Sequence, residues 1–444
     1  MFTLPSSPTL KGPGVWLCAV ALALGACSKP PPPSPPPPPP PLPSPTPEPT
    51  PTPVPTPKPI PALVRKPLPT AVLFNGISLE SAVVAELGAD LASTDRLDKD
   101  SYALELTLRL RLPRAASTLE DFASCDPTLP PVFSDLPGLL AGARVAPYFE
   151  KFYQLKTADV RRKMANLETV LSRHNFYDCE TMLELENPAT SRKAFLLLAD
   201  MDVNTDGSDG DRNVTVDSSS PFYLPQTSYR WPKQSPRPNP MLAVEENRLS
   251  KLEGEKSQNG LKPARLAEIE SGISLAKRRI HDLTKWSFLV SSVDPFIVLP
   301  GFIMRDHSGP FVPKIGDYAV VIHGGKAYPA ILGDSGPSHK AGEASLRLTR
   351  ELTPSATASA RAVSDLSVTY LVFPGSADTD PSPPDLARWR ERCESLVREL
   401  GGFTIELHAW PDIVPPWPTP TPSPTVTPDP EPVDSLTPTP TPEG

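Results

Sequence analysis

The sequence predicts an α+β fold: a β-barrel or mixed sheet with helical decoration and an inserted helical hairpin. Short apolar runs bounded by turn residues predict strands, most of them in the second half of the chain, and amphipathic patterns between them predict helices. A repeat of apolar residues at steps of three and four in the middle of the chain predicts the hairpin. Strands interspersed with helices in this way are typical of a layered α+β domain.

Proline content limits the folded part of the chain. Of 64 prolines in 444 residues, 23 lie between Ser28 and Thr70 and 13 between Pro411 and Gly444. These two segments lack the apolar residues needed to form a core. We therefore predict a Pro-rich disordered linker over residues 28–70, one domain over 71–410 and a Pro/Thr-rich disordered tail over 411–444. As polyproline II, at ~3.1 Å per residue, residues 30–69 of this linker would span roughly 120 Å.

The overall charge excludes some classes of partner. The net charge of −8 and the pI of about 5.4 argue against a nucleic-acid-binding protein. Beyond the N-terminus no apolar run reaches the ~18 residues that a membrane-spanning helix needs, which excludes a polytopic membrane protein. We expect a monomer without a nucleic-acid partner.

The N-terminus has the pattern of an export signal. Lys11 precedes an apolar run over residues 15–24, which is too short to span a bilayer as a mature helix. The run ends Leu-Gly-Ala-Cys at Cys27, which resembles a bacterial lipobox. The resemblance implies a signal peptide over residues 1–27, lipid on Cys27 and, because Ser28 rather than Asp follows, sorting to the outer membrane or cell surface. Several acyl chains would provide stable attachment to the membrane. An ordinary signal peptide with a chance cysteine is the alternative.

The remaining cysteines allow little covalent cross-linking. Cys18 leaves with the signal peptide and Cys27 would carry the lipid, so Cys125, Cys179 and Cys393 remain for cross-linking. At most one intrachain pair can form, and the sequence does not indicate which. No C-x-x-C motif is present, which argues against zinc ribbons and thioredoxin-like redox sites.

The strands and helices follow from periodicity. Residues 101–112 alternate strictly between leucine and polar side chains, which predicts a half-buried strand. The turn at residues 323–326 between two apolar runs predicts a β-hairpin. We predict further strands over residues 195–198, 296–299, 318–322, 327–332 and 368–373, and helices over residues 157–173, 346–351 and 385–400.

The inserted hairpin is predicted over residues 241–286. Glycines at 254 and 260 and Pro263 separate two helical arms. The apolar residues of the second arm are Leu266, Ile269, Ile273, Ala276, Ile280 and Leu283. Such an arm either packs on its own domain or binds a partner.

Two acids near a glycine-rich turn are candidate catalytic residues. Asp334 follows the predicted strand 327–332, and Glu343 comes nine residues later, where we expect a helix to begin. Two carboxylates so placed can face each other across a groove, as glycoside hydrolysis requires. The glycines around them let a polymer approach the backbone. The alternative is an Asp turn followed by a Glu that stabilises a helix N-terminus.

An acidic segment is the second candidate site. Residues 200–217 contain six carboxylates and one cation, Arg212, which suggests a cationic partner. Asp202, Asn204 and Asp206 follow the start of a calcium loop, although Asn213 stands at the twelfth position instead of a bidentate Glu. The segment could instead bind the ammonium groups of a polycation, or be a solvated turn.

Four segments, in this order, resemble motifs of glycoside hydrolase family 75, the fungal-type chitosanases. They are residues 199–207, 296–300, 316–322 and 333–345. The resemblance implies endo-hydrolysis of the β-1,4 linkages of chitosan, a cationic amino-sugar polysaccharide, with inversion at the anomeric carbon and without a cofactor. It places the essential acids at Asp334 and Glu343, with Glu343 as general acid and Asp334 as general base.

The same resemblance gives the acidic segment a role. Ammonium groups of glucosamine would bind to Asp200, Asp202 and Asp206. In an inverting enzyme the two catalytic carboxyl groups should lie ~6.5–9.5 Å apart. The Gly-Asp and Gly-Glu segments also resemble expansin-type double-psi β-barrels, which implies a double-psi-like core.

The sequence departs from the fungal pattern in two places. Asn204 and Thr205 stand where the fungal loop has Asp and Cys, and the interval from Asp334 to Glu343 is shorter. A related amino-sugar polymer could therefore be the substrate. Two other functions stay open from the sequence: a non-catalytic surface lipoprotein that binds polysaccharide or cell wall, and a calcium-stabilised envelope protein.

Overall fold

The computed structural model describes residues 78–85, 102–109, 114–166, 168, 176–358 and 361–418. The predicted signal peptide, the lipidated Cys27, the Pro-rich linker and most of the tail lie outside these residues. In the part described, no helix is both long and apolar enough to cross a membrane.

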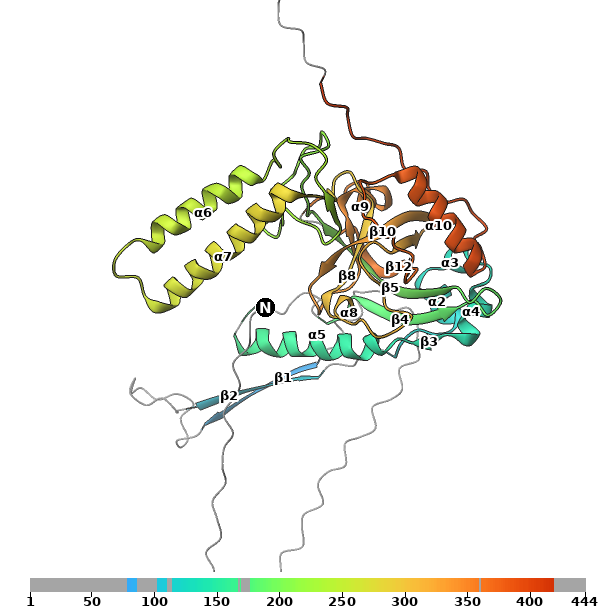
Figure 1. Ribbon diagram of the computed structural model, residues 1–444. Coiled ribbons are helices and arrows are strands. Elements are labelled where there is room, and N and C mark those ends of the chain that lie inside the picture. The colour runs from blue at the N-terminus through green and yellow to red at the C-terminus, as the bar shows by residue number, and fades with distance from the viewer. Residues whose placement is uncertain are drawn as a thin grey trace, which may run out of the picture. The chain divides into compact units, whose positions relative to one another are not determined.

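Six strands form a closed barrel, which confirms the predicted α+β fold with a barrel core (Figure 1). Around the barrel the order is β5, β11, β8, β10, β9 and β12, and β12 pairs again with β5. The β5–β11 and β8–β10 pairs are parallel and the other four are antiparallel, a mixture that suits a double-psi-like barrel. The strands are β5 (Lys193–Asn204), β8 (Phe296–Pro300), β9 (Tyr318–His323), β10 (Lys326–Gly336), β11 (Glu343–Ser345) and β12 (Val363–Val372).

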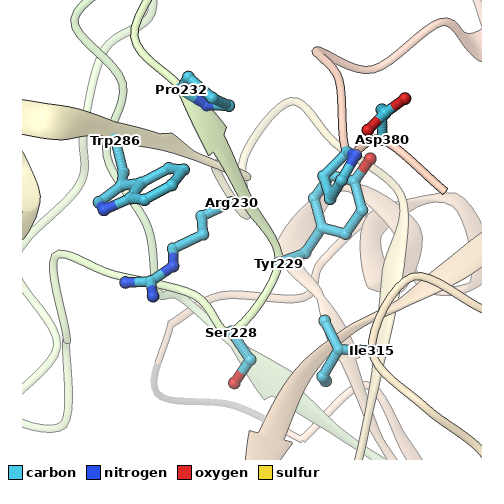
Figure 2. A pocket seen from close by; sticks show the side chains of 8 residues that line it. Ser228, Tyr229, Arg230, Pro232, Trp286, Ile315 and Asp380 are labelled. Carbon is cyan, nitrogen blue, oxygen red and sulfur yellow. The ribbon is translucent and has the colours of Figure 1, made fainter. Parts of the chain in front are cut away.

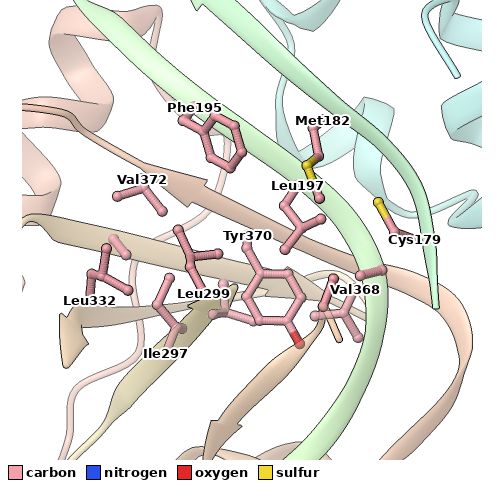
Figure 3. Close-up of a cluster of buried hydrophobic side chains, with 14 of the residues drawn as sticks. Cys179, Met182, Phe195, Leu197, Ile297, Leu299, Leu332, Val368, Tyr370 and Val372 are labelled. Atoms are coloured by element: carbon pink, nitrogen blue, oxygen red, sulfur yellow. The ribbon is translucent and has the colours of Figure 1, made fainter. Parts of the chain in front are cut away.

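Side chains from all six strands fill the interior of the barrel. Leu197, Ile297, Leu332 and Tyr370 are fully buried and belong to one cluster (Figure 3). The cluster continues to α5 (Pro147–Ala165). Burial of these apolar side chains, each contributing about 1.5–3 kcal/mol, is the main force that holds the barrel closed.

A second apolar cluster covers the outside of the barrel. Helix α10 (Leu386–Leu400) lies against it through Trp389 and Leu396. Around the same layer are the short helices α2 (Leu119–Cys125), α3 (Leu129–Val132) and α4 (Leu136–Gly142). Strands β4 (Cys179–Glu186) and β3 (Arg144–Val145) extend the sheet beyond β5.

The inserted hairpin is present as predicted. Helices α6 (Leu242–Lys256) and α7 (Pro263–Lys285) run side by side (Figure 1). Only a few of their residues are buried, among them Ile269 and Leu283. At its base, β6 (Arg230–Pro232) pairs with β7 (Trp286–Phe288), which joins the hairpin to the barrel.

Several predicted limits need correction. The helix expected over 157–173 begins at Pro147, because buried aromatic residues such as Tyr148 and Phe152 continue its apolar face upstream. Residues 167 and 169–175 lie outside the described part. Glu343 begins strand β11 rather than a helix, and α9 (Leu346–Leu352) follows that strand.

The other predicted elements are found close to their expected places. Strand β2 (Tyr102–Arg109) lies within the predicted 101–112 strand and pairs with β1 (Ser78–Ala85). Strands β9 and β10 form the predicted β-hairpin. The described chain continues past the predicted domain limit at 410: the Trp417 indole N–H donates to the Asp211 carbonyl oxygen (2.9 Å) and Arg237 stacks on its ring. The predicted outer limits of the linker and tail stay predictions.

The cysteines form no disulfide among positions 125, 179 and 393. Cys179 and Cys393 are fully buried, and the Cys393 Sγ donates a weak hydrogen bond to the Ala319 carbonyl oxygen at 3.4 Å. They are therefore packing residues of the core.

Candidate active site

The two predicted catalytic acids lie on one face of the barrel, on either side of one strand. In the pairing registers, Glu343 of β11 and Asp334 of β10 are both partners of Val298 on β8. Partners on neighbouring strands point to the same side of a sheet. Val298 belongs to the outer cluster, so both carboxyl groups face the outside of the barrel.

A β-bulge at Gly333 turns Asp334 outward. Leu332 belongs to the interior cluster, and strict alternation would also point residue 334 inward. The pairing with β8 skips Gly333, so Asp334 points to the opposite side. Only glycine fits here, because a Cβ atom would lie 2.6 Å from Leu289 Cδ1 and 2.7 Å from Phe296 Cβ.

Asp334 is nearly buried and strongly hydrogen-bonded. Its side chain is 7% exposed. Its Oδ1 accepts hydrogen bonds from the Ser228 N–H (3.0 Å), the Ser228 hydroxyl (2.6 Å) and the Ser335 N–H (2.8 Å). Burial raises the pKa of Asp334 to about 6, and these hydrogen bonds limit the rise. Asp334 is therefore mostly ionised at neutral pH.

Glu343 has fewer hydrogen bonds and a higher pKa. Its Oε1 accepts a hydrogen bond from Asn204 Nδ2 at 2.9 Å. Burial raises the pKa of Glu343 to about 7, and the charges of Asp202 and Asp334 add to the rise. Glu343 therefore keeps its proton to a higher pH than Asp334 does.

A buried ion pair between Lys156 and Asp178 fixes the loop before Glu343. Lys156 Nζ lies 2.9 Å from Asp178 Oδ2 and also donates to the His339 carbonyl oxygen (3.0 Å). Asp178 Oδ2 accepts the Ala341 N–H at 3.3 Å. These contacts hold residues 339–341, and with them the start of β11 that places Glu343.

Asp206 is the third acid of the site. It is 8% exposed, its Oδ1 accepts the Leu224 N–H (2.7 Å), and Asn204 Nδ2 lies 3.3 Å from its Oδ2. Burial raises the pKa of Asp206 to about 8, with further contributions from the charges of Asp334 and Glu343. Asp206 is thus near both catalytic candidates, and it is mostly protonated at neutral pH.

The three acids predicted to bind ammonium groups differ in accessibility. Asp200 is completely buried and forms an ion pair with Arg361, so its burial does not fit the predicted direct contact with substrate. The same guanidinium lies 2.9 Å from Asp202 Oδ1, and the Asp202 side chain is 24% exposed. Asp202 is therefore a member of the set that a substrate can reach.

Other carboxylates of the acidic segment bind the protein itself. Arg212 lies between Asp209 (2.6 Å) and Asp294 (2.7 Å). Asp211 accepts hydrogen bonds from the backbone N–H groups of Gln234 (2.8 Å) and Ser235 (2.9 Å). Several carboxylates of this segment therefore bind groups of the protein itself and fix the shape of the loop, so they are not available to a cationic partner.

A calcium ion at Asp202, Asn204 and Asp206 stays a prediction. Both oxygens of Asp206 accept hydrogen bonds, and Asn204 Oδ1 accepts the Asp206 N–H (2.9 Å). Calcium would have to displace these contacts. Within the described residues, no group of three or more His, Cys, Asp or Glu side chains is arranged to hold a metal ion. A melting temperature that is equal in calcium and in chelator would reject the prediction.

Sequence reasoning missed two residues of the site. Ser228 was not singled out, because it is distant in sequence and lies in a segment without regular periodicity. Asn204 was noted only as a calcium-loop position and as a departure from the fungal pattern. Its contact with Glu343, 139 residues away, depends on the parallel pairing of β5 with β11.

A barrel with two carboxyl groups of raised pKa on either side of one strand fits a class of glycoside hydrolases. Comparison with known families agrees. Residues 201–407 match the family of fungal chitosanases of glycosyl hydrolase group 75, and this region of the chain is assigned to that family. The match includes Asp202, Asp206, Asp334 and Glu343. The protein is therefore a glycoside hydrolase of the chitosanase class, whose substrate is an amino-sugar polysaccharide. No curated protein matches the chain.

Proposed function

We propose that the protein is an endo-acting, inverting hydrolase of the β-1,4 linkages of chitosan or a related amino-sugar polysaccharide. Glu343 acts as general acid and Asp334 as general base. The observation that supports this most is that both acids are register partners of Val298 on the outer face of the barrel.

The strand geometry favours inversion. Two strands that flank a third have backbones about 9.6 Å apart, because neighbouring strands are about 4.8 Å apart. If the two side chains run parallel from these backbones, their carboxyl groups are nearer to the ~6.5–9.5 Å of inverting enzymes than to the ~5–5.5 Å of retaining ones. The wider gap leaves room for the water that attacks the anomeric carbon.

The order of the two pKa values supports the roles. Glu343, with a pKa of about 7, can still hold a proton when Asp334, with a pKa of about 6, is already ionised. In the reaction Glu343 gives its proton to the glycosidic oxygen as the bond from that oxygen to the anomeric carbon breaks. Asp334 takes a proton from the water whose oxygen bonds to the same carbon. The sum is the addition of one water molecule.

Asp202 supplies the contact with the cationic polymer. It lies opposite Glu343 in the β5–β11 pairing and is partly exposed. A substrate ammonium group beside it would form a charge-assisted hydrogen bond. Neighbouring Arg361 keeps Asp202 in place from the side of the protein.

The test is the release of reducing ends from chitosan. We expect hydrolysis by the wild type, and a loss of about 10²–10⁴-fold or more in Glu343→Gln and in Asp334→Asn. Glu186→Gln on β4 and Asp217→Asn in the acidic loop are exposed matched controls and should retain activity. No release by the wild type, or full release by Glu343→Gln, would reject the proposal.

A further inference from the structure

Asn204, the last residue of β5, binds the proposed general acid directly. Its side-chain Nδ2 donates to Glu343 Oε1 at 2.9 Å and lies 3.3 Å from Asp206 Oδ2. Asn204 is only 5% exposed, so water competes little for these contacts. An uncharged donor therefore stands between two carboxyl groups of the site.

The backbone fixes which end of the Asn204 amide faces the acids. Asn204 Oδ1 accepts the Asp206 N–H at 2.9 Å, and a backbone N–H can only donate, so the amide oxygen must lie on that side. The Asn204 carbonyl oxygen accepts the Ser291 hydroxyl, and the β5–β11 register places Asn204 opposite Ser345. The NH₂ group is therefore held towards Glu343, to which it can only donate.

This donor decides which oxygen of Glu343 carries the proton. In a protonated carboxyl group the carbonyl oxygen is the better acceptor, so the Asn204 contact at Oε1 leaves the proton to Oε2. Within the described residues Oε2 has no hydrogen-bond partner. It lies on the side of β10, because a Cβ atom added to Gly336 would be 3.3 Å from it. The oxygen with the proton thus faces the strand that also carries Asp334.

The same contact gains strength during proton transfer. The O–H bond of Glu343 Oε2 breaks as the hydrogen binds to the glycosidic oxygen, and the carboxylate that is left shares its charge with Oε1. The hydrogen bond from Asn204 is stronger to this charged oxygen than to the neutral one. An interaction that strengthens as charge develops lowers the barrier to the reaction.

We propose that Asn204 is a positioning residue of the hydrolase, which keeps the acid proton of Glu343 on Oε2 and directs it towards the linkage to be cleaved. The proposal rests on the proposed function, because it specifies how the general acid of that reaction is oriented. Asp206 contributes through its backbone N–H, which holds the Asn204 oxygen.

A comparison of two leaving groups tests this role. Chitosan needs a proton on its leaving oxygen, whereas the dinitrophenolate of a dinitrophenyl chitosan oligosaccharide leaves without one. In Asn204→Ala we expect kcat to fall about tenfold to a hundredfold for chitosan and less than about threefold for the dinitrophenyl glycoside. An equal loss for the two substrates would show that Asn204 only supports the fold, and would overturn the proposal.

Asn213→Ala is the matched control. It removes the same side chain from the same acidic segment, where Asn213 Nδ2 binds the Pro416 carbonyl oxygen at 3.2 Å. Both rates should stay at the wild-type level in this variant.

Asn204→Asp is a second variant, which retains the shape of the side chain and the acceptor for the Asp206 N–H and should therefore fold. It places a carboxyl oxygen where Nδ2 lies, 2.9 Å from Glu343 Oε1. A second acid there disfavours the ionised form of Glu343, and loss of the donor in Asn204→Ala does so more weakly. The pKa of Glu343 should rise by about one pH unit in Asn204→Ala, and further in Asn204→Asp.

NMR of carboxyl-labelled glutamate measures this pKa without turnover, and absence of the signal in Glu343→Gln identifies it. The samples contain chelator, so that calcium near Asn204 does not contribute. The other titratable groups that face Glu343 are the same in both variants: Asp202 of β5, Asp206 just beyond it, Asp334 of β10, Lys340 of the preceding loop and Tyr370 of β12.

A Glu343 pKa that equals the wild-type value in both variants would overturn the proposal. Failure of the proposed function looks different. Wild-type protein would then release no reducing ends from chitosan, while the pKa of Glu343 would still rise in both variants.

Discussion

Asp334 is buried and Glu343 is partly buried, and their hydrogen-bond partners separate them chemically. Asp334 accepts three hydrogen bonds on one oxygen, two of them from Ser228. Glu343 accepts one, from Asn204. Hydrogen bonds to a carboxylate favour its ionised form, so Asp334 has the lower pKa and is the acid that is ionised, as the proposed base must be, near neutral pH.

The pH dependence of kcat/KM for chitosan hydrolysis should therefore be bell-shaped. Below pH of about 6 Asp334 becomes protonated and can no longer accept a proton, and above pH of about 7 Glu343 loses the proton it must donate. The rate should peak between these values. A rate that still rises at pH 9 would contradict the assignment.

Ser228→Ala should move one side of that profile only. Loss of the 2.6 Å hydroxyl contact removes a hydrogen bond to ionised Asp334, so the acidic limb should shift to higher pH. The basic limb, which reports Glu343, should stay in place. Movement of both limbs together would show that Ser228 has a general structural role instead of tuning Asp334.

For single residues, the sequence predicts Asp334 and Glu343 as catalytic candidates but does not predict the side chains that surround them. Asp200 stood in the same acidic stretch as Asp202, and nothing in the sequence distinguished the two. Both aspartates contact Arg361, about 160 positions away, and the path of β5 into the barrel buries Asp200 while it leaves Asp202 partly exposed. Contacts of this range depend on the closed fold and leave no local pattern.

Among the elements, the bulge in β10 decides where Asp334 points. The sequence predicted a strand over 327–332 with Asp334 just beyond it, whereas the strand runs from Lys326 to Gly336. It also predicted a helix where β11 begins. Strand β11 has three residues and depends on pairing with β5 and β8, so its own sequence could not indicate it.

Gly333→Ala should reduce both stability and activity. The added Cβ would overlap Leu289 and Phe296, at a cost of about 1–3 kcal/mol, and would disturb the bulge that aims Asp334. Denaturant midpoints and reducing-end assays measure the two effects. Unchanged activity in this variant would mean that the bulge does not set the position of the base.

Gly254→Ala is the control for that substitution. Gly254 lies in helix α6 with open space around its Cα, so alanine should raise stability by up to about 1 kcal/mol. Because the position is far in sequence from the acids, activity should not change.

For the whole molecule, the barrel and the hairpin have separate roles. Under the proposed function the barrel provides the catalytic face, and the base of the hairpin forms one wall of a pocket lined by Ser228 and Trp286 (Figure 2). The overall architecture was predictable because apolar periodicity is strong in both parts. The closure of the barrel through β5 and β11 was not, since parallel pairs lack the short turns that mark a β-hairpin.

We propose that the protein is exported and held at the outer membrane or cell surface by lipid on Cys27. The lipobox-like end of the apolar N-terminal run supports this. Cys27→Ser should move the protein from the membrane fraction to the soluble fraction and abolish fatty-acid labelling, whereas Cys18→Ser should change neither. Fatty-acid labelling that persists in Cys27→Ser would contradict the proposal that Cys27 carries the lipid.

The stereochemistry of hydrolysis tests the central claim most directly. The two acids flank one strand, and the inverting mechanism that we propose needs room for a water molecule between base and anomeric carbon. Proton NMR of the earliest products should show the α-anomer at the new reducing end, because a β-linkage is cleaved with inversion. If the β-anomer appears first, hydrolysis proceeds with retention, and the proposed inverting roles of Asp334 and Glu343 are wrong.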